Sequence, residues 1–475
     1  MSIGSYRAYF EGMVGVTTAT ADRDSARRVD EGSPRTRWNP LTRITFRFAF
    51  LYFGLFCVLY PQPLFAFLGW FGANGWLPPD AIIWQVRVLE PVYHWVGRTV
   101  FGVDARLIVS GSGDLRILWI LLFCVLAVSV AGTLIWSVLD RRRPEYRRLA
   151  GWFLLFIRLC VAGQMLGYGV AKLIPTQMAQ PGLATLLQPY GDFSPIGVLW
   201  SQVGTSPTYE MLLGTAELVG GILLFIPRTA ILGAMLALVD MSLVFVMDMA
   251  FDVPVKILSG HLMLMSLLLL TPEARRLIHV LVLDRPAGRS TAPYPFHTRR
   301  TRLLAALLQI ACIPWLLVPL AHTGWKNYHE SGDGRPHPPL YGIWSVTDFT
   351  RDGHPLPPLL TDENRWQRIV FDAPGTMTYQ RMDGRLRDAT LMLDPRTHHI
   401  TLTSGGQHLI EGEGQPDTPS KPLAEFTFQQ PTPDRLTLDG TLEGHPVTIT
   451  LAHVDPDTFR LRSSGFHWIQ DNPSF

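Results

Sequence analysis

Residues 230–251, with the sequence AILGAMLALVDMSLVFVMDMAF, decide what kind of protein this is. The segment has 22 residues, and its only ionisable side chains are Asp240 and Asp248. As a helix it would be about 33 Å long, at about 1.5 Å per residue, which matches a hydrocarbon core of about 30 Å. Lipid offers no hydrogen bonds to an open backbone, so the segment is predicted to be a membrane-spanning helix.

Six further segments are comparably long and apolar: 44–60, 115–139, 149–173, 211–226, 255–270 and 303–320. Two of them, 211–226 and 255–270, are short, so the expected number of spans is seven, give or take one. Residues 81–103 carry charges at regular intervals and are predicted to form an amphipathic helix in the membrane interface. The predicted transmembrane domain is therefore residues 44–324.

The arginine and lysine content of the loops predicts the orientation, because positive residues remain on the cytoplasmic side. Residues 140–148 contain five arginines and residues 271–302 contain seven, whereas residues 174–210 contain neither arginine nor lysine. With seven spans, the polar segment 1–43 becomes a disordered cytoplasmic tail. Everything after the last span then lies on the opposite side, which is the periplasm if the membrane is a bacterial inner membrane.

Residues 325–475 have a different pattern. Short alternating runs at 376–381, 389–393, 399–403, 424–428 and 435–438 are separated by turn signals such as Asp383-Gly384 and Asp439-Gly440. Strands at this spacing predict an antiparallel β-barrel or β-sandwich. Trp344 near the start, with Arg460 or Arg462 in a late strand, resembles the Trp–Arg closure of lipocalin-like barrels. The domain would either hold a ligand or act as a structural cap that docks a periplasmic protein.

A formal net charge of +2 gives no reason to expect a nucleic-acid partner. Ionisable groups inside the spans are more informative, because they are costly in lipid and normally mark a partner or a functional path. The set expected in or beside the spans is Arg158, Lys172, Glu217, Asp240, Asp248, Asp252, Lys256 and His261.

Glu217 lies about 9 Å inside its span by helix rise, at a depth that Lys172 can reach from a neighbouring helix. Gly220 and Gly221 follow on the same helix face and would let a second helix approach closely. Arg158, in the inner half of its span, is predicted to meet Asp240.

Pro254 is expected to break the helix between two spans, which would place Asp252, Lys256 and His261 together at the outer mouth. Such a cluster could bind an anionic or quinone-like headgroup, or transfer a proton. It could equally consist of ion pairs that fix helix register, or line a transport path. A transporter would be expected to show broken helices in both halves of the chain, and the sequence indicates only the break at Pro254.

Several of these motifs resemble the DoxX family of bacterial membrane proteins. The likeness rests on residues 158–277, about a quarter of the chain, and above all on Gly169-Val-Ala-Lys172-Leu and Glu217-Leu-Val-Gly-Gly221. Four additional motifs resemble a longer subgroup with an extracytoplasmic β-domain: Gly111-Ser-Gly-Asp114, Tyr190-Gly-Asp-Phe-Ser-Pro195, Asp252-Val-Pro-Val-Lys256 and Phe466-His-Trp-Ile469.

The resemblance implies a DoxX-like four-helix core related to quinone-linked thiol and thiosulfate oxidoreductases. Relatives with disulfide chemistry have paired cysteines at the membrane edge, whereas the four cysteines here, at 57, 124, 160 and 312, show no such spacing. This departure puts thiol exchange in doubt. The order of parts also resembles the architecture of vitamin-K-dependent carboxylases, in which a quinol is oxidised inside the helical bundle.

The sequence therefore predicts a membrane bundle that binds a quinone or a lipid-like molecule and is linked to a membrane redox process. The expected acid–base groups are Glu217, Lys172, Asp252, Lys256 and His261, and the expected binding residues are Arg158, Asp240, Asp248, Gly220 and Gly221. No metal site is expected, and membrane lipid is an expected partner. The alternatives are a non-catalytic scaffold that docks a periplasmic protein, and a quinol-oxidising enzyme.

Overall fold

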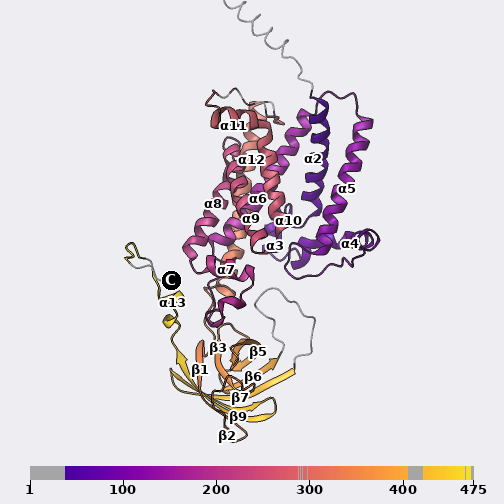
Figure 1. Cartoon of the computed structure of the whole chain (residues 1–475). Coiled ribbons are helices and arrows are strands. Elements are labelled where there is room, and N and C mark those ends of the chain that lie inside the picture. Colours follow the sequence, from indigo (N-terminus) through magenta and orange to yellow (C-terminus); the bar gives the residue numbers. More distant parts are fainter. Residues whose placement is uncertain are drawn as a thin grey trace, which may run out of the picture.

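The computed structural model describes residues 38–286, 288, 290, 292–296, 298–404, 421–465 and 467–471. Residues 1–37, most of the predicted cytoplasmic tail, lie outside the described part, as does Phe466 of the C-terminal motif. The chain forms a helical bundle followed by a β-barrel, which lies beyond the end of the bundle opposite to α11 (Figure 1).

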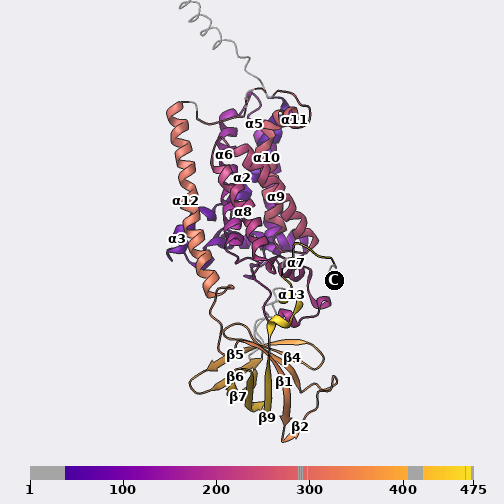
Figure 2. The same cartoon turned by 90° about the vertical axis from the view of Figure 1, so that its left-hand side faces the viewer.

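Within the described residues, seven helices are long and apolar enough to cross a membrane, as the sequence predicts. The long helices are α2 (Pro40–Leu59), α5 (Arg116–Leu139), α6 (Arg147–Leu173), α8 (Pro207–Phe225), α9 (Ala230–Ala250), α10 (Lys256–Leu270) and α12 (Arg299–Glu330), with α11 (Ala274–Leu281) continuing beyond α10. Helix α12 includes Pro314 and Pro319 and runs along one side of the bundle (Figure 2). The protein is thus a membrane protein by the length and composition of its helices.

Short helices gather at the end of the bundle that faces the barrel: α3 (Gly69–Ala73), α4 (Trp84–Val96) and α7 (Pro195–Gly204). Helix α4 occupies the middle of the predicted interfacial segment. One of its faces leaves Val88, Val92 and Trp95 exposed, with Trp95 64% exposed, while Tyr93 is buried. An exposed apolar face on a short helix is the pattern expected in the membrane interface.

The C-terminal domain is a closed antiparallel barrel, not a sandwich. Its strands are β1 (Gly342–Arg351), β2 (His354–Pro355), β3 (Trp366–Phe371), β4 (Thr376–Arg381), β5 (Leu386–Asp394), β6 (His399–Ser404), β7 (Lys421–Thr432), β8 (Arg435–Leu442) and β9 (His445–Val454). Strand β1 pairs with β3, each strand from β3 to β8 pairs with the next, and β1 also pairs with β9, which closes eight strands. The two-residue strand β2 pairs only with the end of β1.

Backbone geometry at the turns corrects one prediction. Glu443 and Gly444, both with positive φ, form the tight turn between β8 and β9. Asp439-Gly440, predicted to be a turn, instead lies inside β8, where Gly440 is opposite Phe426. A Cβ atom at Gly440 would collide with the Glu425 carbonyl oxygen, so glycine is needed there for close strand packing.

Buried aromatic side chains fill the barrel around Trp344, Trp366 and Phe426. The lipocalin-like Trp–Arg closure is not the arrangement found. The Trp344 indole donates to the Leu340 carbonyl oxygen at 2.9 Å, and Arg460 and Arg462 lie in the short helix α13 (Arg460–Ser463), not in a strand.

The barrel arginine that is buried is Arg365, 3% exposed, which donates hydrogen bonds to the carbonyl oxygens of Leu356, Trp366 and Thr347. Desolvation lowers the pKa of this guanidinium, and the carbonyl acceptors replace its lost water.

The barrel is attached to the connection between α6 and α7. Leu183 and Leu187 of that connection are buried against Ile343 and Val370 of the barrel. The Asp372 carboxylate, just after β3, accepts a hydrogen bond from the Leu183 backbone N–H at 2.8 Å. These apolar and polar contacts fix the barrel over the end of the bundle.

Candidate functional site

The site begins with the close approach of α6 and α8. A Cβ atom at Gly169 would lie 2.7 Å from the Leu218 backbone nitrogen, and one at Gly214 would lie 2.6 Å from the Leu173 nitrogen. Real Cβ atoms do not approach that closely, so both positions require glycine. Small residues on facing helices are the usual means of close packing in membranes, and here they bring the side chains of α6 directly against α8.

At this contact Lys172 and Glu217 form a buried ion pair, as the sequence predicts. The Lys172 ammonium donates to Glu217 Oε1 at 2.6 Å, and the two residues are 6% and 1% exposed. The ammonium also lies 5.5 Å from the centroid of the Tyr168 ring, a cation–π contact one helical turn earlier in α6. The second carboxylate oxygen of Glu217, Oε2, is buried and has no hydrogen-bond partner among the residues that the structure describes.

Three further acids interact with Lys172, and each has one buried carboxylate oxygen without a hydrogen-bond partner among the described residues. They are Glu210, Asp240 and Asp248, and each interacts electrostatically with Lys172. Among the described residues, Glu210 Oε2, Asp240 Oδ2 and Asp248 Oδ2 are buried and accept no hydrogen bond from the protein. We call Glu210, Glu217, Asp240 and Asp248 the carboxylate cluster.

Charge within the carboxylate cluster is unbalanced. Four ionised acids against the single Lys172 ammonium would leave a net charge of −3 in an apolar bundle. Buried charges of one sign are too costly to remain uncompensated, so bound protons or a guest molecule must neutralise the cluster. The arrangement can thus hold and release protons, or donate hydrogen bonds from protonated carboxyl groups.

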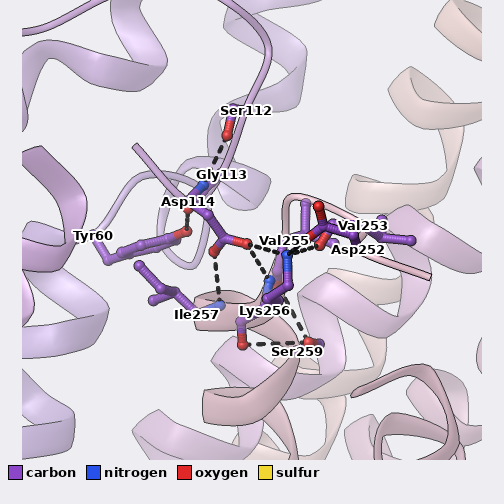
Figure 3. Close-up of polar contacts among 10 residues, drawn as sticks. All are labelled: Tyr60, Ser112, Gly113, Asp114, Asp252, Val253, Val255, Lys256, Ile257 and Ser259. Carbon is purple, nitrogen blue, oxygen red and sulfur yellow. Dashed lines mark hydrogen bonds and ion pairs between the residues drawn. The ribbon is translucent and has the colours of Figure 1, made fainter. Parts of the chain in front are cut away.

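A second polar group adjoins the cluster at the turn between α9 and α10 (Figure 3). Asp114 comes from the loop before α5, and its two carboxylate oxygens accept hydrogen bonds from the Lys256 and Ile257 backbone N–H groups at 2.9 and 3.0 Å. These N–H groups belong to the first turn of α10, so Asp114 caps that helix from a distant part of the chain.

The same loop is held at two other points. Gly113 donates from its backbone N–H to the Pro254 carbonyl oxygen at 2.8 Å, and the Tyr60 hydroxyl donates to the Gly113 carbonyl oxygen at 2.9 Å. Burial, together with Asp114 and Tyr168 nearby, raises the pKa of the Tyr60 phenol.

Lys256 closes this turn rather than pointing freely into the bundle. Its ammonium lies 2.8 Å from Asp252 Oδ1, 3.7 Å from Asp114 Oδ2 and 3.0 Å from the Val253 carbonyl oxygen. The hydrogen bond from Lys256 lowers the pKa of Asp252, whose side chain is 83% exposed. Asp252 and Lys256 are therefore placed at the rim of the site, with Lys256 also in electrostatic range of Asp248.

His261 does not join Asp252 and Lys256, contrary to the predicted three-residue cluster. Its Nδ1 lies 2.6 Å from the Ile257 carbonyl oxygen and its Nε2 lies 2.9 Å from the Tyr52 hydroxyl. A neutral ring protonated at Nδ1 satisfies both contacts, and the ring stacks on Phe56 at 3.9 Å between centroids. His261 packs α10 against α2.

Arg158 is also placed differently from the prediction. Its guanidinium donates to the Gln309 side-chain oxygen of α12, and Asp240 interacts instead with Glu217 and Lys172. Arg158 therefore lies outside the carboxylate cluster.

The two glycines after Glu217 serve helix packing. A Cβ atom at Gly221 would lie 2.9 Å from a Leu166 methyl carbon, and Gly220 faces Met165 and Leu236 at 3.4 and 3.6 Å. They hold α8 against α6 and α9.

Sequence reasoning missed Glu210 and Asp114 as site residues. Glu210 stands seven residues before Glu217, two helical turns away on the same face, so helical periodicity could have found it. Asp114 was visible only as part of a motif, because no local pattern shows that a loop will cap a helix 142 residues later.

Comparison with known proteins adds a relationship but no activity. The uncharacterized protein YwoB of Bacillus subtilis (strain 168) is 32% identical over 123 residues, which cover 26% of this chain and 78% of that protein. No family model matches the chain. No solved structure matches it significantly either.

Proposed function

Because this chain belongs to the family of the uncharacterized Bacillus subtilis protein YwoB, its function has to be inferred from its own site, and we propose that the bundle binds a quinone or a similar lipid-soluble molecule beside Lys172 and Glu217. The binding would serve a redox process of the membrane, as the DoxX resemblance suggests.

The carboxylate cluster is the observation that supports this function. A quinone has an apolar ring with carbonyl oxygens that accept hydrogen bonds, and its reduced form carries two acidic protons. Protonated carboxyl groups and the Lys172 ammonium can donate hydrogen bonds to the quinone, and ionised carboxylates can accept hydrogen bonds from its reduced form. An apolar bundle with unpartnered carboxyl oxygens suits both forms.

The topology belongs to the same proposal. The distribution of arginine supports a topology with the α11 end of the bundle in the cytoplasm and the barrel in the periplasm of a bacterium, with an inner-membrane location. A barrel packed with its own side chains is better suited to docking a periplasmic protein than to holding a ligand. Membrane lipid would surround the long helices and contact the exposed face of α4.

The test is to identify what co-purifies with the bundle, and then to measure binding of a short-chain ubiquinone through quenching of tryptophan fluorescence. Glu217→Gln and Lys172→Met should weaken binding at least tenfold, since each removes a central group. Asp80→Asn, an exposed acid outside the cluster, is the control. Equal affinity in all four proteins, with no bound quinone or lipid in the wild type, would favour a scaffold that docks a periplasmic protein.

A further inference from the structure

We propose that the carboxylate cluster is a proton half-path that opens only toward the barrel side of the membrane and ends at Asp240. This goes beyond ligand binding, because the acids would exchange protons with one aqueous phase whether or not a quinone occupies the bundle.

The outer end of the half-path has two acids, Glu210 and Asp248. Glu210, in the first turn of α8, accepts a hydrogen bond from the Met178 N–H at 3.0 Å, in the connection that leads to the barrel. Asp248 lies in the last turn of α9 and in electrostatic range of Asp114 and Lys256 at the rim. Helix α8 begins directly after α7, and α9 runs back so that it ends at the level where α8 begins. Both acids are therefore at the barrel-facing end of the bundle, where Figure 2 shows α7.

Two acids lie deeper. Glu217 is seven residues beyond Glu210 on α8, or about 10 Å by helix rise, and Asp240 is eight residues from Asp248 on α9, or about 12 Å. Tyr168 bridges these levels, because its phenol interacts with both Asp248 and Glu217. The remaining spacing is short enough for a few water molecules, which unpartnered carboxyl oxygens could bind.

Inward of these residues the helices that carry the cluster become apolar. Residues 218–227 of α8 and its end, 230–239 of α9 and 262–272 of α10 and beyond contain no ionisable side chain. On α6 the inner group is Arg158, which donates to Gln309. The acids of α8 and α9 are consequently confined to the barrel half of the bundle, with apolar stretches of both helices inward of them.

The charges facing the cluster set its proton content. From α6 it is faced by Lys172 and Tyr168, and from the rim by Lys256 and Asp114. Glu210 also interacts with Asp333, which follows α12. Helix α7, packed on α8, has no titratable residue. With Lys172 paired to Glu217, the other three acids form no ion pair within the described part of the chain, so we expect them to exchange protons when the local charge changes.

The experiment uses full-length protein in sealed liposomes, with its orientation determined by protease access to the barrel. A pH step is applied on either side, and infrared difference spectra follow the C=O stretch of protonated carboxyl groups. A step on the barrel side should change this band promptly, whereas the same step on the other side should change it at least tenfold more slowly. Glu217→Gln should remove part of the change, and Asp80→Asn should leave it intact.

Equal rates from both sides would overturn the half-path, as would a band that never responds to pH. The half-path would also be refuted if added sodium ions suppressed the change in the carboxyl band, because a bound cation, and not protons, would then neutralise the cluster. Glu210→Gln, paired with Asp248→Asn, tests the entrance: together they should slow the barrel-side response while circular dichroism shows an unchanged fold. None of these measurements requires a quinone, so loss of quinone binding and loss of the half-path are separate results.

Discussion

Removing the ammonium of Lys172 is the most direct perturbation of the site. In Lys172→Met, the Glu217 carboxylate loses the ammonium that donates to it at 2.6 Å, while Glu217 is only 1% exposed in the folded protein. Breaking a buried pair by removing one partner typically costs about 3–5 kcal/mol. The Glu217 carboxyl group can avoid this cost by taking up a proton, which makes it neutral. For a carboxylic acid with an ordinary pKa of about 4.3, that costs about 3.7 kcal/mol at pH 7, because each unit is worth about 1.36 kcal/mol.

The expected loss of unfolding free energy is therefore about 3–4 kcal/mol at pH 7. It should shrink to about 1 kcal/mol at pH 5, because protonation is then much cheaper. Lys172→Met combined with Glu217→Leu removes both charges and should recover wild-type stability to within about 1 kcal/mol.

The assay is reversible unfolding in mixed micelles, with increasing dodecyl sulfate, followed by circular dichroism. A single variant as stable as wild type at both pH values would show that the pair is hydrated and not buried. A double variant as unstable as the single one would show that packing of the Lys172 stem, and not charge, stabilises this contact.

Four other predictions follow from contacts away from this pair. Gly214→Ala should destabilise the bundle by about 1–3 kcal/mol in the same unfolding assay, because its Cβ would lie 2.6 Å from the Leu173 nitrogen. The control is Gly72→Ala, which should have little effect because no other part of the chain lies within 4 Å of the added Cβ. Asp114→Ala should cost about 0.5–2 kcal/mol through loss of the α10 cap and speed amide exchange at Ile257; unchanged exchange would contradict the capping role. Asp372→Ala should speed amide exchange at Leu183 without altering barrel melting, and a melting point that falls with it would assign Asp372 to the barrel core. The pKa of Asp252 is lowered in the folded protein, so its contribution to stability is present above the ordinary carboxyl pKa and is lost as pH falls below about 4. The melting temperature of wild type should therefore fall more than that of Asp252→Asn below this pH. An equal decline in both proteins would refute the prediction.

The fold was largely predictable from the sequence because its strongest signals are local. An apolar run such as residues 230–251 has few alternatives to a spanning helix, and turn residues separate the strands of the β-domain. Closure of the barrel was not predictable, since it depends on pairing between β1 and β9, about a hundred residues apart. The Asp439-Gly440 error has the same origin: the dipeptide has turn composition, but its neighbours place it in a strand.

For the site, the sequence predicted the pair in which helix depth and helix face agree, and failed where only the depth agrees. Lys172 and Glu217 meet because both the depth and the glycine-lined face agree. Arg158 and Asp240 are also at compatible depths, yet Arg158 turns toward α12 and reaches Gln309. Likewise, His261 follows Lys256 by five residues, which points it to a different side of α10 and toward Tyr52.

The attachment of the barrel bears on the proton half-path as well. The connection between α6 and α7 makes contacts with both the bundle and the barrel. Its Met178 N–H donates a hydrogen bond to Glu210 of the cluster, and its Leu183 N–H, five residues later, donates one to Asp372 of the barrel. Between them, the Gln180 N–H binds Asp333 of the segment that leads into the barrel. A protein that displaced the barrel would therefore pull on the chain that donates to Glu210. Because Glu210 has no ammonium of its own, loss of that donor would disfavour its ionised form, and docking on the barrel would change the protonation of the outermost acid in the bundle.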